Sequence, residues 1–214
     1  MKISSINLGL PAHLSYGDKE IHTGGDKHAV PEALLRTLNF DGDGQADLVN
    51  HGGADKAVCV YAADLYSHWE SVLGHPMHPG AFSENLTVQG ALDEAIHVGD
   101  IFQIGEAVVQ VSQPRQPCGK LAARNGDKHF VKLVQANGTG FYMRVLREGM
   151  VRAGDMFALV TAHPARISIA MINDILYGRS EDRALIAQLA AMPEYSEYGR
   201  RKMGQRMSQM NSVT

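Results

Sequence analysis

A chain of 214 residues with 44% apolar content can bury one main hydrophobic core and a smaller attached element. Its formal net charge of -3 leaves no broad basic field for a nucleic-acid backbone, so we expect no nucleic-acid partner. The first ten residues lack the apolar core of a signal peptide, and no stretch approaches the roughly 18 apolar residues of a membrane helix. We therefore expect a cytoplasmic protein without a membrane partner.

Short apolar runs separated by Gly, Asp, Asn and Pro extend to about residue 165, a pattern typical of sheet proteins with tight turns. It predicts strands over residues 2–8, 57–61 and 107–112. Residues 98–102 are echoed by residues 153–157, each with a Gly-Asp turn before an apolar strand. This echo suggests equivalent corners of a barrel.

Helical spacing appears first over residues 62–73 and again over residues 129–136. Beyond residue 165 it dominates, and three helices are predicted over 168–176, 182–192 and 196–210. The chain is therefore divided into a β-rich domain, residues 1–165, and a three-helix appendage, residues 166–214.

The loop over residues 49–56 is a candidate anion-binding segment. The consecutive Gly52 and Gly53 would let backbone N–H groups approach a phosphate, and Lys56 would supply a positive charge. Asn50 and His51 precede the glycines. An ordinary tight turn explains the same residues and, on this loop alone, is the simpler interpretation.

Cys118 is the candidate reactive residue. It follows Pro117 where a helix is expected to begin, between Arg115 and Lys120. A helix N-terminus and two cations favour the thiolate, which is the form that attacks electrophiles and binds metals. Cys59 lies within an apolar strand and is predicted to be a core thiol with a raised pKa.

Glu84 and Asn85 stand side by side in a loop between these two segments. They could orient the amide or ring nitrogens of a ligand, or they could cap a turn. The residues alone favour the cap.

Taken in order, these pieces resemble the MOSC family, named for the C-terminal domain of molybdenum cofactor sulfurase. The resemblance rests on His51-Gly-Gly-x-Asp-Lys, Phe82-x-Glu-Asn-Leu, Gly99-Asp-x-Phe and Gln-Pro-Arg115-x-Pro-Cys118. The helical tail is similar to that of the YiiM-type branch. One departure is Ser83, which stands where the family usually has glycine, so a position with positive φ would be strained here.

The resemblance implies a mainly β fold with helices, a mixed barrel like that of pyruvate kinase. It also implies molybdenum cofactor, with Cys118 as the protein ligand of the metal, because a soft thiolate suits a metal already bound by sulfur. The remaining residues implied to bind the cofactor or line the site are Asn50, His51, Gly52, Gly53, Lys56, Glu84, Asn85, Arg115 and Lys120.

The implied activity is the reductive dehydroxylation of N-hydroxylated bases such as 6-N-hydroxylaminopurine, a detoxification in which a reductase partner returns two electrons to the metal. A second hypothesis is a sulfur carrier that uses a Cys118 persulfide. A third is a binding module without chemistry, and it requires Cys118 to be replaceable.

Three other features favour structural interpretations. His75 and His78 flank Pro76 in a loop that no nearby acid or thiol completes as a metal site. The basic run 200–202 with Arg206 is most simply the solvated face of the last helix. The methionine stripe of that helix predicts either a core contact or a homodimer contact.

Overall fold

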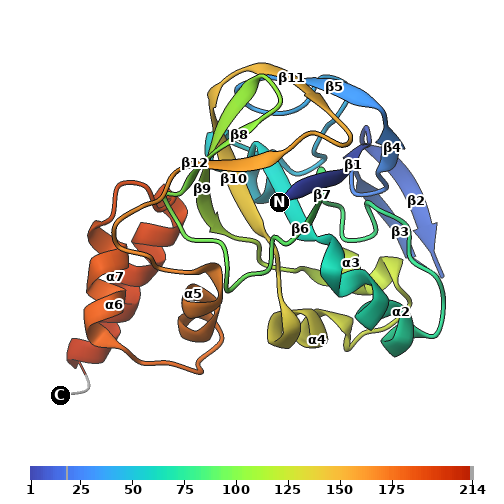
Figure 1. The fold of residues 1–214 in the computed structure, drawn as a ribbon. Helices are drawn as coiled ribbons and strands as arrows, with labels where there is room; N and C mark the ends of the chain where they lie inside the picture. The colour runs from blue at the N-terminus through green and yellow to red at the C-terminus, as the bar shows by residue number, and fades with distance from the viewer. Residues whose placement is uncertain (18, 213–214) are drawn as a thin grey trace.

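One mixed sheet runs through the computed structural model, which describes residues 1–17 and 19–212 (Figure 1). Its strands are β1 (Lys2–Leu8), β4 (His28–Val30), β6 (Val58–Ala62), β7 (Leu86–Gln89), β8 (Ile101–Ile104), β9 (Ala107–Pro114), β10 (Phe141–Arg147) and β12 (Phe157–Thr161). They are ordered β12-β8-β9-β10-β6-β7-β1-β4. Among these pairs β6 and β7 run parallel, whereas the others are antiparallel.

The burial of individual strands explains their sequences. All five residues of β6 are buried, which accounts for its uninterrupted apolar run in the middle of the sheet. In β1 the buried Ile3 and Ile6 belong to the main core, while Lys2 and Ser4 are exposed. The predicted strands over 2–8, 57–61 and 107–112 are confirmed within two residues.

The sheet curls so that β12 returns to the start of β1. The backbone N–H of Ile3 donates to Asp155 O at 3.0 Å, and that of Phe157 donates to Met1 O at 3.0 Å. Only one bridge, Lys2 to Met156, is formed there within the described residues, so the two strands do not pair along their length. The mainly β fold with helices is confirmed, and the closed pyruvate-kinase-like barrel stays a prediction.

The two Gly-Asp turns that echo each other each precede a strand of the same antiparallel pair. Gly99 and Gly154 both have positive φ, 86° and 95°. The strands that follow them, β8 and β12, pair antiparallel with Phe157 opposite Ile104. The repeat therefore marks two turns at opposite ends of one antiparallel strand pair.

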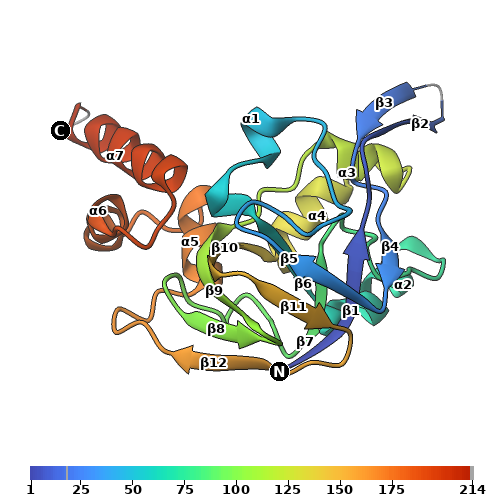
Figure 2. The ribbon, with the colours of Figure 1, turned by 90° about the horizontal axis from the view of Figure 1, so that it is seen from above.

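Two pairs of short strands lie outside the main sheet. The pair β2 (Ala12–Tyr16) and β3 (Lys19–Thr23) forms a projecting hairpin, and β5 (Glu32–Leu35) pairs with β11 (Gly149–Arg152) (Figure 2).

Three helices enclose a second, aromatic core. They are α2 (Tyr66–Leu73), which continues the 3₁₀ turn η2 (Ala63–Leu65), α3 (Gly119–Arg124) and α4 (Phe130–Asn137). Tyr61 stacks on Phe82 with ring centroids 3.9 Å apart, and the Trp69 indole donates to the Tyr61 hydroxyl at 2.7 Å. Leu121 of α3 packs in the same cluster, so this core holds α3 in place.

The C-terminal helices lie to one side of the sheet (Figure 1). They are α5 (Ile169–Leu176), α6 (Arg183–Ala191) and α7 (Glu197–Ser212), close to the predicted ranges. The side chains of Ser168 and Asp182 accept from the first turns of α5 and α6, at 3.1 and 3.0 Å. None of the helices in the described ranges is both long and apolar enough to span a membrane.

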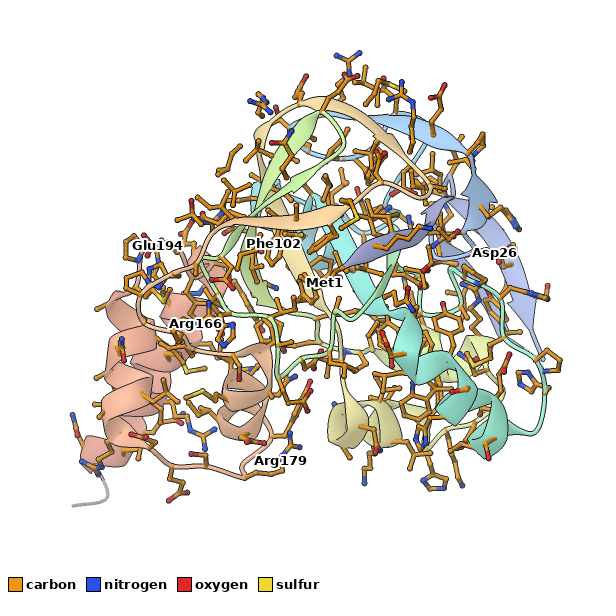
Figure 3. The ribbon with its side chains drawn as sticks, viewed as in Figure 1. Met1, Asp26, Phe102, Arg166, Arg179 and Glu194 are labelled. Atoms are coloured by element: carbon orange, nitrogen blue, oxygen red, sulfur yellow. The ribbon has the colours of Figure 1, made fainter. Side chains whose placement is uncertain are left out.

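The three helices share the main core. Met203 of α7 is buried in it, with Met207 and Met210 packed against it, so the methionine stripe makes core contacts. Arg166 and Glu194 lie where the helices join the sheet (Figure 3), and the Arg166 guanidinium is 3.3 Å from Asp100. The proposed boundary at residue 165 stays a prediction.

Candidate functional site

A pocket lies between α1 (Leu48–His51), the end of the β2–β3 hairpin and the start of α3. Figure 2 shows these three elements on the same side of the molecule. The walls of the pocket come from residues 23–25, from the loop over 44–47, and from the loop that leads into α3. Single side chains of α1, the 3₁₀ turn η1 (Ala54–Lys56), β6 and β10 complete it. Loops between core elements therefore build the pocket, and the sheet and the aromatic core fix their positions.

Cys118 lies in this pocket at the N-cap of α3 and is partly exposed. Burial alone would raise the pKa of its thiol. A hydrogen bond from the His51 side chain and one from the backbone N–H of Lys120 outweigh burial, the charge of Arg115 adds to them, and the pKa falls to about 7. A large share of this thiol is therefore anionic at neutral pH.

Arg115 lines the same pocket and is buried. Its backbone N–H donates to Gly140 O at 2.9 Å, and its Nη1 atom is 3.5 Å from Thr139 O. A guanidinium carries five N–H donors, so most of its capacity is not used by these contacts. Its charge faces both Cys118 and Cys59.

Lys27 is a pocket residue that the sequence interpretation missed. Its ammonium is buried and pairs with Asp43. Asp43 also accepts from the backbone N–H of Gly9 and from the side-chain amide of Asn85, both at 2.8 Å. The Gly-Gly-Asp-Lys run at 24–27 resembles the Gly-Gly-Ala-Asp-Lys run at 52–56, and this similarity could have identified it.

The predicted residues His51, Lys56, Asn85 and Lys120 all line the pocket. The Lys56 ammonium donates to Asn50 O at 2.5 Å, and the Lys120 ammonium donates to His22 O at 3.2 Å. The charged side chains of the lining are Lys27, Lys56, Arg115 and Lys120, against the single carboxylate of Asp47. The pocket is therefore suited to an anion.

Asn50, Gly52 and Gly53 lie outside the pocket lining. The Asn50 amide donates to Asp47 at 2.9 Å, which fixes the turn before the glycines. Gly53 has φ of 97° and allows the chain to pass from α1 into η1. These residues position His51 and Lys56, and their direct contact with a cofactor stays a prediction.

Glu84 is also outside the lining and is fully buried. One carboxylate oxygen accepts from Tyr66, Gly80 and Thr87 at 2.5, 2.9 and 2.6 Å, and the other accepts from Phe82 N–H at 3.1 Å. This is the capping role that the residues alone favoured. A direct contact between Glu84 and a cofactor stays a prediction.

Ser83 has φ of 60°, in the left-handed region. The sequence interpretation expected strain if this position needed positive φ, and that condition is met. The side chain of Ser83 also lines the pocket and lies close to Gly25, where a Cβ atom would come within 2.7 Å of Ser83 Oγ.

Cys59 is buried, and burial raises the pKa of its thiol to about 11, so the expectation of a core thiol is confirmed. It nevertheless reaches the pocket, as does Tyr142, which pairs with it across β6 and β10. Tyr142 was missed because an isolated tyrosine in a strand carries no local signal.

Within the described residues, His, Cys, Asp and Glu form no group of three or more that could hold a metal ion. A metal bound by Cys118 would therefore need its other ligands from a cofactor. The neutral groups around Cys118, including the Asn85 and Gln116 amides, suit the hydrogen-bonding edge of a heterocycle.

Comparison with known proteins places these features in a family. The MOSC domain model matches residues 47–158. The protein YflK of Bacillus subtilis is 48% identical over 197 residues, which are 91% of this chain and 89% of YflK. The crystal structure of YiiM from Geobacillus stearothermophilus superposes with a TM-score of 0.82 at 34% identity, covering 96% of this chain and 98% of that one.

A reductase of Gibberella moniliformis is 31% identical over 150 residues. The match covers 67% of this chain but only 26% of that protein, which is therefore much longer than the shared region.

Proposed function

This chain belongs to the MOSC domain family, in its YiiM-type branch, and from that premise we propose that it is a molybdenum-cofactor-dependent oxidoreductase. Its reaction is the removal of oxygen from N-hydroxylated compounds such as 6-N-hydroxylaminopurine, with Cys118 as the metal ligand. The observation that carries the proposal is a thiol with a pKa of about 7 that opens into a pocket whose charged side chains are mainly cationic. The name of the Gibberella relative, a reductase, supports the reaction type.

The residues present fit the cofactor. A thiolate is a soft ligand suited to a metal already bound by sulfur. Lys56, Arg115 and Lys120 provide positive charge for the phosphate of the pterin, whereas the Lys27 ammonium is paired with Asp43. The Gln116 amide lies in the same lining and can meet the ring edge. Some predicted site residues do not line the pocket but hold the segments that carry these groups. They are Glu84, Asn50, Gly52 and Gly53.

When bound, the cofactor supplies the two-electron chemistry. The overall reaction converts R–NH–OH, two electrons and two protons into R–NH₂ and water, and the electrons come from an external reductase. His51 and the backbone N–H of Lys120 lower the pKa of Cys118 to about 7 and so favour the deprotonated sulfur that binds a metal. Burial raises the pKa of Tyr142, so its hydroxyl keeps its proton and can donate a hydrogen bond to the leaving oxygen.

The test compares the wild type with Cys118→Ser, and uses Cys59→Ala as the matched control. Reduction of 6-N-hydroxylaminopurine and the molybdenum and pterin content are measured for each protein. We expect loss of both metal and activity in Cys118→Ser and retention of both in Cys59→Ala. Full molybdenum content and activity without the Cys118 thiol would overturn the proposal.

The same experiment separates the rival functions. Sulfane sulfur on Cys118, without stoichiometric molybdenum, would establish the sulfur carrier, which uses the same thiolate but leaves the cationic lining without a role. Ligand binding that is unchanged in Cys118→Ser, without turnover, would establish the binding module. We place the reductase in the cytoplasm, where a thiol such as Cys118 stays reduced.

A further inference from the structure

Three cations surround one exposed aromatic ring beside the pocket. The ammonium of Lys56 lies 5.5 Å from the centroid of the Tyr198 ring, and the charged groups of Arg201 and Lys202 each lie 5.9 Å from it. Tyr198 keeps 43% of its surface exposed. We call these four residues the α7 rim, since three of them belong to the first turns of α7.

The rim is continuous with the pocket. Lys56 and Gln116 line the pocket, and the Lys202 ammonium donates to the Gln116 side chain at 3.2 Å. The backbone N–H of Glu197 donates to the Asp55 carboxylate at 3.2 Å, which fixes the start of α7 against the η1 turn. A ligand that extends outward from the pocket therefore reaches the rim directly.

The positive charges of the rim are not neutralised by the protein. In the part of the chain that the structure describes, no carboxylate lies within salt-bridge distance of Lys56, Arg201 or Lys202. The two acids nearest to Lys56 are committed elsewhere. Asp47 accepts from Asn50, and Asp55 pairs with Arg144 at 2.7 Å.

This arrangement favours a phosphoryl group over other ligands. Arg201 and Lys202 are adjacent on α7 and both lie near the same ring, and guanidinium and ammonium groups match the oxygens of a phosphate. The cations already lie near the Tyr198 ring, so it is not a free platform on which a base could stack. A cluster around one ring is also far smaller than the interface a stable protein partner needs.

We propose that Arg201 and Lys202 of the α7 rim bind the phosphate of the substrate, so that the N-hydroxylated base enters the pocket as part of a nucleotide. The inference rests on the proposed function for the reaction, and on the rim contacts for the phosphate. The preferred substrates are then nucleoside monophosphates, and the nucleoside and the free base react less efficiently.

The kinetic test uses the holoenzyme with 6-N-hydroxylaminopurine as the free base, as its nucleoside and as its nucleoside 5′-monophosphate. We expect kcat/KM for the monophosphate to exceed that for the nucleoside by about tenfold or more at low salt. The double variant R201A/K202A should abolish this preference and leave the nucleoside rate unchanged. Lys132→Ala, which removes an exposed cation of α4, is the matched control and should keep the preference.

A binding test separates this inference from the proposed reaction. Adenosine 5′-monophosphate and adenosine are titrated into wild type and R201A/K202A. If the wild type binds the monophosphate more tightly than R201A/K202A does, the phosphate site in the rim is supported. This holds even when the protein reduces no N-hydroxylated substrate and the proposed reaction is wrong. Equal kcat/KM for the three substrates in an active enzyme would overturn the proposal that the rim binds the substrate phosphate. Loss of pterin and molybdenum from R201A/K202A would also overturn it, because the rim would then hold the cofactor.

Discussion

The His51 side chain donates a hydrogen bond to the Cys118 thiol, which joins the end of α1 to the start of α3. His51→Ala removes this donor, so we expect the pKa of Cys118 to rise above 7 and back towards its ordinary value. Because only the thiolate reacts with iodoacetamide, alkylation at pH 7 should slow several-fold. The measurement is the alkylation rate of Cys118 from pH 5 to pH 10.

Cys59 does not interfere with this measurement, because burial raises the pKa of its thiol to about 11. Cys118→Ser in the same assay confirms that the signal comes from one thiol. A pH profile that is the same in wild type and His51→Ala would mean that Lys120 and Arg115 alone set the pKa of Cys118.

Residues of the site could be predicted from the sequence where they belong to a local motif. His51, Lys56, Arg115 and Cys118 belong to runs with glycine or proline spacing that suggest a ligand loop. Lys27 ends a similar Gly-Gly-Asp-Lys run, but its place in the pocket depends on its partner Asp43, which is 16 residues away and is itself held by Asn85. The order of the strands in the sheet brings these loops together around one pocket, and sequence periodicity does not reveal that order.

Ser83 stores backbone strain that glycine would relieve. Replacement of a left-handed serine by glycine removes about 1 kcal/mol of strain, while the greater freedom of the unfolded chain returns about half of it. We expect Ser83→Gly to raise the free energy of unfolding by about 0.5 kcal/mol in urea titrations.

Ser208→Gly is the control for this change, because Ser208 lies within α7 in helical conformation. There the same substitution should lower stability by about 0.5 kcal/mol. Two shifts of the same sign would contradict the assignment of strain to Ser83.

Glu84 organises the loop behind the pocket through four accepted hydrogen bonds. In Glu84→Gln one carboxylate oxygen becomes an amide that faces donors, so at least one buried N–H or hydroxyl loses its partner. We expect a loss of about 2–3 kcal/mol in the free energy of unfolding, measured by urea denaturation.

Glu70→Gln is the matched control, because Glu70 makes one hydrogen bond, to Met77 N–H, that a glutamine side-chain oxygen can replace. Its stability should change by less than about 0.5 kcal/mol. A comparable loss in both variants would show that charge, and not the hydrogen bonds of Glu84, stabilises this region.

The fold was predictable where burial gives a strong pattern. The helical spacing over residues 168–176 and 182–192 placed α5 and α6 correctly within a residue or two. The β2–β3 hairpin was missed although the five residues of its first strand alternate apolar and polar, because none of them is buried and so short a run carries little weight. Strand β5 depends on pairing with β11, more than 100 residues later, which local sequence does not encode.

The buried carboxyl of Asp93 makes the free energy of unfolding depend on pH. Burial raises the pKa of its carboxyl to about 6, although hydrogen bonds from the backbone N–H groups of Thr139 and Gly140 lower it in part. The unfolded chain releases this proton near the ordinary value of 3.8. The folded protein therefore holds the proton more tightly, and stability should fall as pH rises from about 4 to about 6, by about 3 kcal/mol in total.

The Asp93 carboxylate connects the helical appendage to the segment beside Arg115, and these contacts offset part of the stability lost when the carboxyl ionises. It accepts from Asn173 of α5 at 3.0 Å, and from the N–H groups of Thr139 and Gly140 at 2.8 and 3.1 Å. Gly140 O in turn accepts from Arg115 N–H.

Asp93→Asn should remove the fall in stability between pH 4 and pH 6, and it should add a loss that is independent of pH because one acceptor oxygen becomes a donor. Urea titrations of both proteins at half-unit pH steps measure the difference, in which the other carboxyl groups cancel. Curves that stay parallel across this window would show that Asp93 titrates near its ordinary pKa, and that burial at this junction does not hold the proton.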